Sequence, residues 1–565
     1  VDPRETETTR SADRHLKVRP GGDVYLLLAL AAVMVRDDLV DGDFLRDHTS
    51  GFEAVSAALR QVDVADMASR CGLTVEEIEA TARDLAAVAP MAILYDLGVE
   101  QTPFSTLNSY LIRLLLALTG NIGRRGGNVF FNTFQPPVID TARLSEPERA
   151  LVSGIPAIRA LGNAGMFSPT LVPEEVMVDH PERLRALIVE GANPLLSYSD
   201  SQRWREACAK LDLLVVIDPA MTETAWLADY VLPAPVGYEK WEFAAFPRAF
   251  PEVYVQVRPP VVSGPAEALP EPEIYVRLAE AMELFGPLPD ELRQLGAAAL
   301  TAEGAAQYLA TAQSLISGSE QRMLFWSYRA VGPHLPAPSL VAIWLMSHIN
   351  VFLRGEAVLR TLGDEWASQG PFELAAEVFR RIMTHPEGVE IARVREEGHL
   401  EEHINHTDKR IRLAPEAMLA EIQRARATTP TVDPEYPLVL SAGLRTRWTA
   451  NTIQRDPAWR KGRGPHCALN LSPADAARLG IADGAAVRVS TNRGALQLPA
   501  RIDAKLPDGF VWMPNGFGMI YPDQPGDRAI DGANQNELTD TADRDPFTGV
   551  PHHRYVRCRV EPAGS

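Results

Sequence analysis

The sequence contains little cysteine, and the few cysteines it has are not grouped. Cys71, Cys208, Cys467 and Cys558 are far apart, and no two of them form a Cys-x-x-Cys pair. This spacing excludes a disulfide framework and is not that of a zinc or iron–sulfur site. We therefore expect four ordinary buried thiols and no metal ligand in this chain.

Long apolar runs and an excess of positive charge are missing as well. The longest apolar run, Val24 to Val35, is too short to cross a bilayer, and there is no signal-peptide pattern. The net charge of −19 argues against nucleic acid or an anionic membrane as a partner. We expect a cytoplasmic protein without membrane insertion, in which arginines, backbone N–H groups and helix N-termini hold any anionic ligand.

The 565 residues are too many for one hydrophobic core, and 46% hydrophobic content is ordinary for a globular protein. We expect three or four domains. The chain begins with Val1 rather than Met, directly before an Asp-Pro turn that lacks the expected strand in front of it. We interpret it as the C-terminal part of a longer polypeptide, cut inside a domain.

One phrase of the sequence occurs twice, at 2–13 and at 218–229. Asp-Pro, Thr-Glu-Thr and Ala-Asp keep the same offsets in both copies. The second copy follows the apolar run 213–217, which has the composition of a buried parallel strand. An acidic residue just after such a strand is placed to bind a ribose or a base edge, so the repeat predicts two nucleotide sites. The alternative is a pair of unrelated turns, because Asp, Pro and Thr are common turn and cap residues.

Two α/β domains are predicted, over 1–140 and 141–265. In the first, we expect Asp23 to cap a helix that starts at Val24, and a short strand over 91–95. In the second, apolar strands alternate with a helix. This pattern predicts two pseudo-equivalent, doubly wound parallel sheets, with ligands at the carboxyl ends of the strands.

The rest of the chain changes character twice. Residues 266–430 are predicted to be a mainly helical elaboration and linker. Their His399, His403 and His406 could line one helix face, and we interpret them as solvated surface residues rather than as a metal site. Residues 431–565 have short alternating strands separated by turns, which predicts a β-barrel domain.

Taken together and in order, several motifs of this sequence resemble those of the molybdopterin oxidoreductase family typified by dimethyl sulfoxide reductase. The resemblance covers nearly the whole chain except 290–395. The motifs are Val1-Asp-Pro-Arg4, Val18-Arg-Pro-Gly-Gly-Asp23, Leu118-Thr-Gly-Asn-Ile-Gly-Arg124, Glu190-Gly-Ala-Asn-Pro194, Thr222-Glu-Thr-Ala225, Asn470-Leu-Ser-Pro-Ala-Asp475 and Asn534-Gln-Asn-Glu-Leu-Thr539.

The resemblance implies a bis(molybdopterin guanine dinucleotide) cofactor with molybdenum or tungsten. Asp2 and Asp23 would serve one guanosine, and Asp218 with Thr222 the other, because a carboxylate can accept two hydrogen bonds from a guanine edge. The full set of expected cofactor-binding residues is Asp2, Arg4, Thr6, Asp23, Gly191, Asn193, Asp218, Thr222, Arg445, Arg447, Asn451, Thr452, Asn515, Asn534 and Asn536.

Two departures from the family limit what can be named. The metal-ligating residue and the cysteines of a 4Fe–4S cluster would lie upstream of Val1, so no catalytic residue is assigned and this chain alone is expected to be inactive. Formate dehydrogenases of the family carry an arginine shortly after the paired-glycine turn, whereas 129–135 contains none. This difference disfavours formate oxidation.

We therefore expect the large catalytic subunit of a molybdenum or tungsten oxidoreductase that performs two-electron or oxygen-atom-transfer chemistry on a small molecule. An electron-transfer protein or subunit is the expected protein partner. Two alternatives stay open at this point. One is a non-catalytic structural relative within a respiratory complex, and the other is a non-redox hydratase or transhydroxylase that uses the same cofactor.

Overall fold

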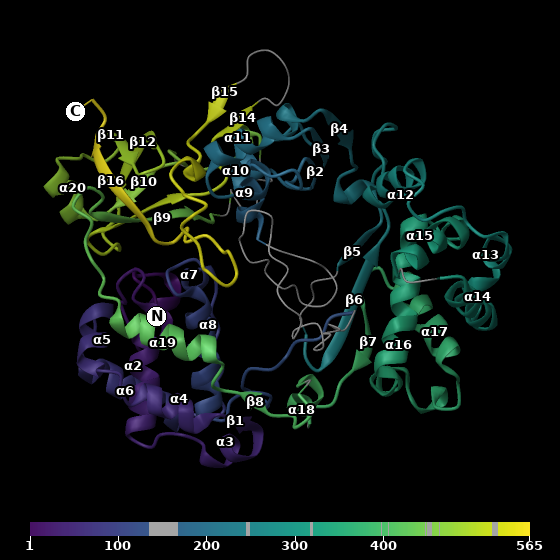
Figure 1. Cartoon of the computed structure of the whole chain (residues 1–565), viewed down its shortest axis with the longest axis horizontal. Coiled ribbons are helices and arrows are strands. Elements are labelled where there is room, and N and C mark those ends of the chain that lie inside the picture. Colours follow the sequence, from purple (N-terminus) through teal and green to yellow (C-terminus); the bar gives the residue numbers. More distant parts are fainter. Residues whose placement is uncertain are drawn as a thin grey trace. The chain divides into compact units, whose positions relative to one another are not determined.

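The computed structural model describes residues 1–134, 168–244, 249–316, 320–396, 398–404, 406–446, 448, 455–462, 464–521 and 529–564. The chain divides into two compact units. Unit 1 consists of Val1–Asn128, Asp140–Val231 and Ile404–Ser565, and unit 2 of Val129–Ile139 and Leu232–His403. Both units mix helices with strands, as the sequence predicts, and Figure 1 labels their elements.

The N-terminal part of unit 1 is a helical cluster around α2 (Asp23–Arg36). All residues of α2 from Val24 to Val35 except Leu27 are buried. A helix that is apolar on every side belongs in a core, which explains the long apolar run. The surrounding helices are α1 (Glu7–Ser11), α3 (Gly42–His48), α4 (Phe52–Leu59), α5 (Val64–Cys71), α6 (Val75–Ala87), α7 (Leu97–Glu100), α8 (Ser105–Leu118) and α19 (Glu416–Ala427).

The strand predicted over 91–95 is wrong. The segment is extended, but the backbone N–H of Met91 donates to Asn121 Oδ1 at 2.9 Å, and that of Ile93 to Asn128 Oδ1 at 2.8 Å. Amide side chains thus replace a neighbouring strand. Within 1–128 the structure describes a single strand, β1 (Thr49–Ser50), which pairs in parallel with β8 (Ile411–Arg412).

The second part of unit 1 contains the predicted parallel strands. β2 (Ala186–Glu190) pairs in parallel with β3 (Leu213–Asp218), and β4 (Tyr230–Pro233) completes a three-stranded sheet. The N–H of Gly191 continues the ladder to the carbonyl of Ile217 at 3.0 Å, so the carboxyl ends of both strands lie side by side. The helices of this part are α9 (Val172–Met177), α10 (Pro194–Ser197) and α11 (Ser201–Lys210).

The C-terminal part of unit 1 is a closed barrel, as predicted. Its strand order is β10-β12-β11-β16-β9-β13. The strands are β9 (Leu438–Leu444), β10 (Leu469–Leu471), β11 (Ala486–Ser490), β12 (Ala495–Ile502), β13 (Phe510–Pro514) and β16 (Val556–Pro562). A separate pair, β14 (Met519–Tyr521) and β15 (Ala529–Asp531), is antiparallel. Closure removes the free sheet edges and encloses a core of aliphatic side chains.

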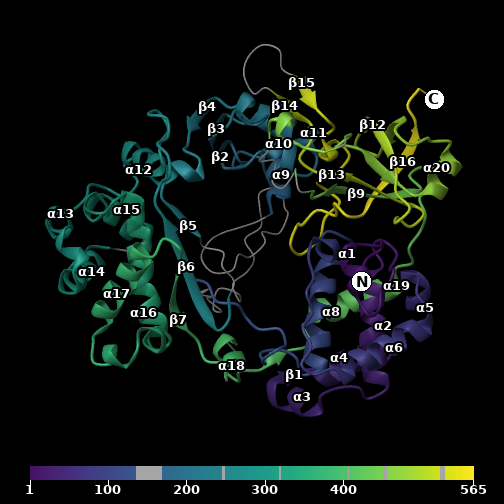
Figure 2. The ribbon, with the colours of Figure 1, turned by 180° about the vertical axis from the view of Figure 1, so that it is seen from behind.

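Unit 2 combines a small antiparallel sheet with helices (Figure 2). Its strands are β5 (Glu242–Ala244), β6 (Glu252–Arg258) and β7 (Val389–Arg393). The helices are α12 (Glu271–Ala281), α13 (Asp290–Leu295), α14 (Ala302–Leu315), α15 (Glu320–Ala330), α16 (Val341–Leu362), α17 (Pro371–Thr384) and α18 (His399–His403). Most of the described elements between residues 266 and 430 are helices, and β7 and β8 (Ile411–Arg412) lie in the same range.

The cysteines are buried free thiols, as predicted, and burial raises the pKa of Cys71, Cys208 and Cys467 to about 11. Over the described ranges, no group of three or more His, Cys, Asp or Glu side chains is arranged to hold a metal ion. The prediction of a solvated surface residue is wrong for His399. Its side chain is buried, because Nε2 accepts the N–H of Phe130 at 2.9 Å.

Within the part of the chain that the structure describes, no helix has both the length and the apolar character that crossing a membrane requires.

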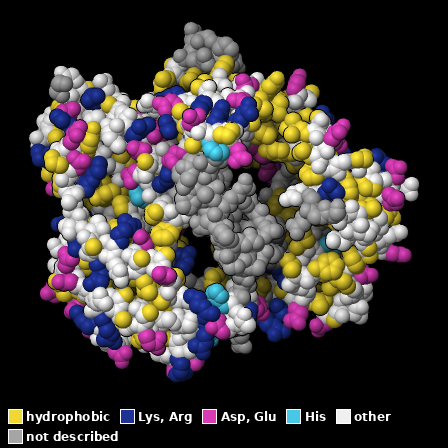
Figure 3. Space-filling view, viewed as in Figure 1, with side chains coloured by type: hydrophobic (Ala, Val, Ile, Leu, Met, Phe, Trp, Pro, Cys, Tyr) yellow, Lys and Arg dark blue, Asp and Glu magenta, His cyan; other side chains and the backbone are white. Residues whose placement is uncertain are grey.

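Acidic and basic side chains are interspersed on the faces of the two units that Figure 3 shows. On these faces the net negative charge is therefore not gathered into a single patch.

Candidate functional site

The two Asp-Pro phrases fold into the same turn. Asp2 Oδ1 accepts the N–H of Arg4 at 2.9 Å, and Asp218 Oδ1 accepts the N–H of Ala220 at 2.8 Å. In both aspartates, the second carboxylate oxygen has no hydrogen-bond partner among the described residues. One oxygen thus fixes the turn while the other stays available to a ligand.

The threonines of the two phrases also correspond. Thr6 Oγ1 accepts the N–H of Thr9 at 3.1 Å and caps α1. Thr222 Oγ1 accepts the N–H of Ala225 at 3.1 Å, just before the short 3-10 helix Ala225–Leu227. The repeat in sequence is therefore a repeat of local structure.

Asp23 has a different place from the one predicted. Gly22 is the N-cap of α2 and Asp23 is its first helical residue, so the prediction of a capping aspartate is wrong. Burial, with a smaller effect of the nearby charge of Asp2, raises the pKa of the Asp23 carboxyl to about 6. Among the described residues no basic side chain forms an ion pair with Asp23.

The acidic group of the second phrase is partly buried too. Burial raises the pKa of Asp218, against the hydrogen bond from Ala220 and the charge of Arg455. Beside it, Gly191 has a φ of +55°, and a Cβ placed there would meet no atom within 4 Å. The backbone after β2 is therefore open to close approach, as a phosphate-binding turn requires.

Asn193 is held by protein contacts. Its Oδ1 accepts hydrogen bonds from the N–H of Thr224 at 3.2 Å and from Thr224 Oγ1 at 2.8 Å, and its Nδ2 donates to Glu223 Oε2 at 2.6 Å. The side chain thus joins the loop after β2 to the second phrase. A contact of Asn193 with a diphosphate stays a prediction, while the geometry gives it a positioning role.

Arg455 is a residue of this site that the sequence analysis missed. Its guanidinium pairs with Glu223 at 3.1 Å, and the N–H of Ile520 donates to the same carboxylate at 2.6 Å. Burial alone would raise the pKa of Glu223, but the hydrogen bond from Arg455 brings it below its ordinary value. In the sequence, an acidic residue inside the repeated phrase was the one indication that a basic partner such as Arg455 could be expected.

Two asparagines of the C-terminal part hold the loop between β2 and α11. Asn534 Nδ2 donates to the carbonyl of Leu195 at 3.1 Å, and Asn536 Nδ2 donates to that of Leu196 at 2.7 Å. Both asparagines are buried, at 8% and 0% exposed. Their predicted contact with the cofactor stays a prediction, because in this structure these donors bind the protein.

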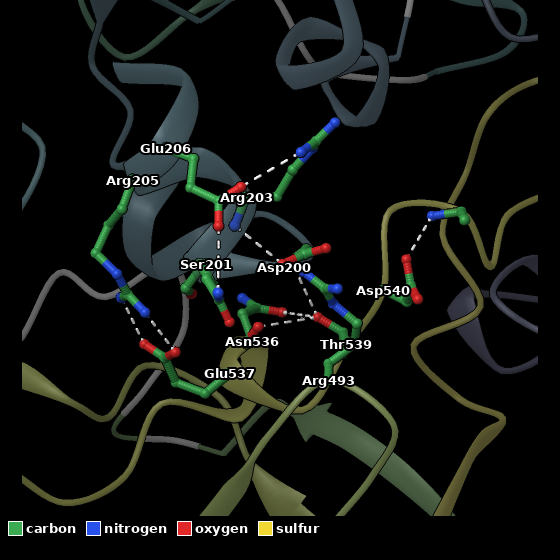
Figure 4. A network of polar contacts seen from close by, with 12 residues as sticks. Asp200, Ser201, Arg203, Arg205, Glu206, Arg493, Asn536, Glu537, Thr539 and Asp540 are labelled. Atoms are coloured by element: carbon green, nitrogen blue, oxygen red, sulfur yellow. Dashed lines mark hydrogen bonds and ion pairs between the residues drawn. The ribbon is translucent and has the colours of Figure 1, made fainter. Parts of the chain in front are cut away.

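Figure 4 shows that this connection is a wider polar network around the N-terminus of α11. Asp200 accepts a hydrogen bond from Arg493 at 2.8 Å, and its N–H donates to Thr539 Oγ1 at 3.0 Å. On the next turn of the helix, Arg205 forms a two-pronged ion pair with Glu537 at 2.7 Å. Bidentate pairs of this kind fix orientation as well as distance, so the network holds the N-terminal turns of α11 against Arg493 and the segment 536–539.

A pair of arginines lies at the end of β9 and before β16. Burial and, to a smaller extent, the neighbouring charge of Arg445 lower the pKa of Arg554 to about 10, whereas the charge of Asp96 raises it. The guanidinium of Arg554 has only long contacts, with Ser441 Oγ at 3.3 Å and the carbonyl of Ala442 at 3.5 Å. Two cations without an ion-pair partner among the described residues suit an anionic group. The sequence analysis named Arg445 but missed Arg554.

The other predicted residues are distributed as follows. The Arg4 guanidinium lies over the ring of Trp512, 5.7 Å from its centroid. The N–H of Asn515 donates to the carbonyl of Leu444 at 3.0 Å, in the turn that follows β13. Arg447, Asn451 and Thr452 lie outside the described residues.

With this geometry in place, comparison with known families is decisive. The family described as "Molybdopterin oxidoreductase" matches this chain over residues 1–281. The family described as "Molydopterin dinucleotide binding domain" matches it over residues 438–557. The chain belongs to the molybdopterin oxidoreductase family. The resemblance inferred from the sequence motifs is thereby confirmed, and a molybdenum or tungsten pterin cofactor follows from the family.

Individual relatives span several activities. An F420-dependent formate dehydrogenase 2 subunit alpha of Methanococcus maripaludis is 25% identical over 531 residues, which are 91% of this chain and 66% of that protein. An acetylene hydratase of Syntrophotalea acetylenica is 23% identical over 598 residues, 98% of this chain and 72% of the relative. The solved structure of acetylene hydratase from Pelobacter acetylenicus has a TM-score of 0.67 at 18% identity, covering 100% of this chain and 73% of that one.

The last match establishes the fold and not the activity. This chain spans 42% to 66% of the length of three curated relatives that it matches.

The residues of unit 1 fit the cofactor that the family implies. They offer two carboxylates with an available oxygen in matched turns, an open glycine turn, and an arginine pair that forms no ion pair with another described residue. Guanine edges donate hydrogen bonds and diphosphates are anionic, so the chemistry of each group has its complement.

Proposed function

We propose that this protein is a catalytic subunit that uses bis(molybdopterin guanine dinucleotide) and molybdenum or tungsten for two-electron or oxygen-atom-transfer chemistry on a small molecule. When bound, the metal supplies the redox chemistry. The chain itself binds and orients the two dinucleotides. Family membership supports the cofactor class, and the matched turns of the two phrases support two guanosine sites.

Each residue of the candidate site has a role in the proposal. Asp2 and Asp23 would accept hydrogen bonds from one guanine edge, and Asp218 would do the same for the other, with Thr222 holding its turn. Gly191 would let a diphosphate approach the backbone, and the arginine pair, Arg445 and Arg554, would neutralise phosphate charge. The remaining predicted residues, which would contact the cofactor or position its contacts, are Arg4, Thr6, Asn193, Arg447, Asn451, Thr452, Asn515, Asn534 and Asn536.

Further parts of the proposal concern the whole protein. An electron-transfer protein or subunit would exchange electrons with it, since a relative is the alpha subunit of a formate dehydrogenase. A 4Fe–4S cluster would belong to the same assembly, with ligands other than the four buried cysteines of this chain. Catalysis by this chain alone is not expected, because no residue in it is assigned as the metal ligand. We place the assembly in the cytoplasm.

The observation that carries the proposal is the available oxygen of Asp218, and one substitution tests it. In Asp218→Asn, the amide oxygen can still accept the N–H of Ala220, but the outward carboxylate oxygen is lost. We expect cofactor binding to weaken by about five- to 150-fold, corresponding to about 1–3 kcal/mol for paired acceptors, so that less cofactor is retained in the purified protein. Molybdenum, tungsten and guanine nucleotide contents of the purified protein measure the loss.

Asp212→Asn is the matched control. Asp212 precedes the same strand, β3, but forms exposed ion pairs with Arg183 and Arg185. Its substitution is expected to leave occupancy unchanged. Equal metal and nucleotide contents in the two variants would contradict the guanosine site at Asp218.

A second candidate function is a non-redox hydratase with the same cofactor. The sequence match to an acetylene hydratase over 98% of the chain favours it. Purified protein that hydrates its substrate without reducing or oxidising an added electron carrier would support this candidate. A non-catalytic relative would instead contain neither molybdenum nor tungsten.

A further inference from the structure

A short segment of unit 2, Val129–Phe134, is held by two polar side chains of helix α16. Arg354 Nη2 donates to the carbonyl of Thr133 at 2.9 Å, and Asn350 Nδ2 donates to the carbonyl of Phe134 at 2.5 Å. The two acceptors belong to consecutive residues, whose Cα atoms are about 3.8 Å apart. The side chains of Arg354 and Asn350 therefore reach the same place in the fold.

Arg354 interrupts its helix. Its φ of −145° and ψ of 42° are non-helical, while α16 continues on both sides from Val341 to Leu362. Burial lowers the pKa of its guanidinium to about 10. The group is thus a charged one at neutral pH, and in the described structure it pairs with no carboxylate within 4 Å.

Asn350, and Asn132 next to Thr133 in the chain, each have a polar side-chain atom without a partner among the described residues. Asn350 is fully buried and its Oδ1 accepts no hydrogen bond, while Asn132 is 6% exposed and its Nδ2 donates none. Buried polar atoms without partners cost about 1–3 kcal/mol each, and a buried unpaired charge costs more. The main chain at Asn132 is fixed as well, because its N–H donates to the carbonyl of Ala249 at 2.9 Å.

We propose that Arg354, Asn132 and Asn350 form a binding site for a small carboxylate. With one N–H of Arg354 used by Thr133, the guanidinium still has N–H groups for a bidentate contact with a planar carboxylate. Asn132 Nδ2 adds a donor to the bound oxygens. Asn350 Oδ1 accepts from a hydroxyl or water next to them.

A water molecule alone does not account for this arrangement. Water can satisfy the two amide atoms, but it leaves the charge of the partly buried guanidinium without a counter-charge. A carboxylate supplies both the charge and the planar geometry. The site uses none of the residues proposed to hold the cofactor, so it is independent of the proposed function and can fail separately.

Isothermal titration calorimetry on the whole protein tests the proposal, with chloride keeping the ionic strength constant. The probes are acetate, its neutral isostere acetamide, and the tetrahedral anion phosphate. We expect acetate to bind and acetamide and phosphate to bind at least tenfold more weakly. Absence of acetate binding, or phosphate binding as tight as acetate, overturns the proposal.

Arg354→Gln is expected to weaken acetate binding at least tenfold, and Arg354→Lys, which keeps the charge but loses the fork, to weaken it less. The matched control is Arg395→Gln, because Arg395 forms only an exposed ion pair with Glu356. The control is expected to bind acetate like the wild type. Acetate affinity that is equal in Arg354→Gln and Arg395→Gln overturns the assignment.

Asn132→Asp keeps the assignment testable if the arginine variants do not fold. In the proposed site this change supplies a carboxylate from the protein itself, which would compensate the charge of Arg354. We expect a higher melting temperature without acetate and loss of acetate binding. Acetate binding at wild-type affinity in a folded Asn132→Asp protein contradicts the proposed site.

Discussion

The two copies of the repeated phrase share a backbone but differ in their surroundings. Both begin with an aspartate that accepts the N–H two residues later, and both continue with a threonine whose hydroxyl accepts the N–H three residues later. In the first copy, α1 has no buried residue. In the second, Thr222, Thr224 and Ala225 are all buried.

The glutamates within the phrases make the contrast sharper. Glu7 is exposed, whereas Glu223 is contacted by Arg455, Asn193 and the N–H of Ile520. The residues of the phrase are therefore sufficient to form the local turn. The tertiary contacts between this turn and the rest of unit 1 depend on residues far away in the sequence. Local chemistry can be duplicated even where tertiary contacts are not.

The largest difference is expected when the two glutamates are removed. The side chains of Glu223 and Arg455 are only 12% and 13% exposed, so Glu223→Ala leaves a buried guanidinium without its partner. We expect the free energy of unfolding to fall by about 3 kcal/mol. Urea denaturation measures the change.

Glu7→Ala is the control from the other copy. Because Glu7 is exposed, its removal is expected to change the free energy of unfolding by less than about 0.5 kcal/mol. Similar decreases in the free energy of unfolding of the two variants would mean that Glu223 does not stabilise the second copy. The contrast between the copies would then disappear.

A smaller difference is expected in the response to pH. The pKa of Asp23 beside the first copy is raised to about 6, so its stabilising contribution is complete below its ordinary value of 3.8 and is lost as pH rises through 6. The pKa of Glu223 is lowered, so its contribution is present above the ordinary glutamate range and is lost as pH falls below it. The contributions of Asp23 and Glu223 to stability therefore change in opposite directions as pH rises.

Asp23→Asn is expected to remove the loss of stability between about pH 4 and 6 that Asp23 causes in the cofactor-free protein. Urea unfolding across this range measures it, with Asp13→Asn, an exposed position in the first copy, as the control. An unchanged pH profile in Asp23→Asn would show that the carboxyl of Asp23 is not desolvated.

Local rules predicted those elements whose partners are near in sequence. The helix α20 (Pro473–Leu479) has Ser472 as N-cap and Gly480 in the left-handed conformation at its end, as cap chemistry requires. The parallel strands β2 and β3 followed from their apolar runs. The strand prediction for 91–95 was wrong because the asparagines that accept hydrogen bonds from its N–H groups lie about thirty residues further along the chain.

The candidate site divides in the same way. Asp2, Asp218 and Thr222 could be found from the repeat, because the turn that they form is encoded within a few residues. Arg455 and Arg554 could not, since their importance comes from long-range contacts and from burial, which a single sequence does not reveal.

The central claim is that two matched turns in one chain hold two guanosines. Its most direct test is the number of guanine nucleotides released by acid from the purified, metal-loaded protein, relative to its molybdenum or tungsten. We expect two guanine nucleotides per metal in the wild type, and less than half of the wild-type metal and nucleotide per chain in Asp218→Asn. One guanine nucleotide per metal, or none, would contradict the account.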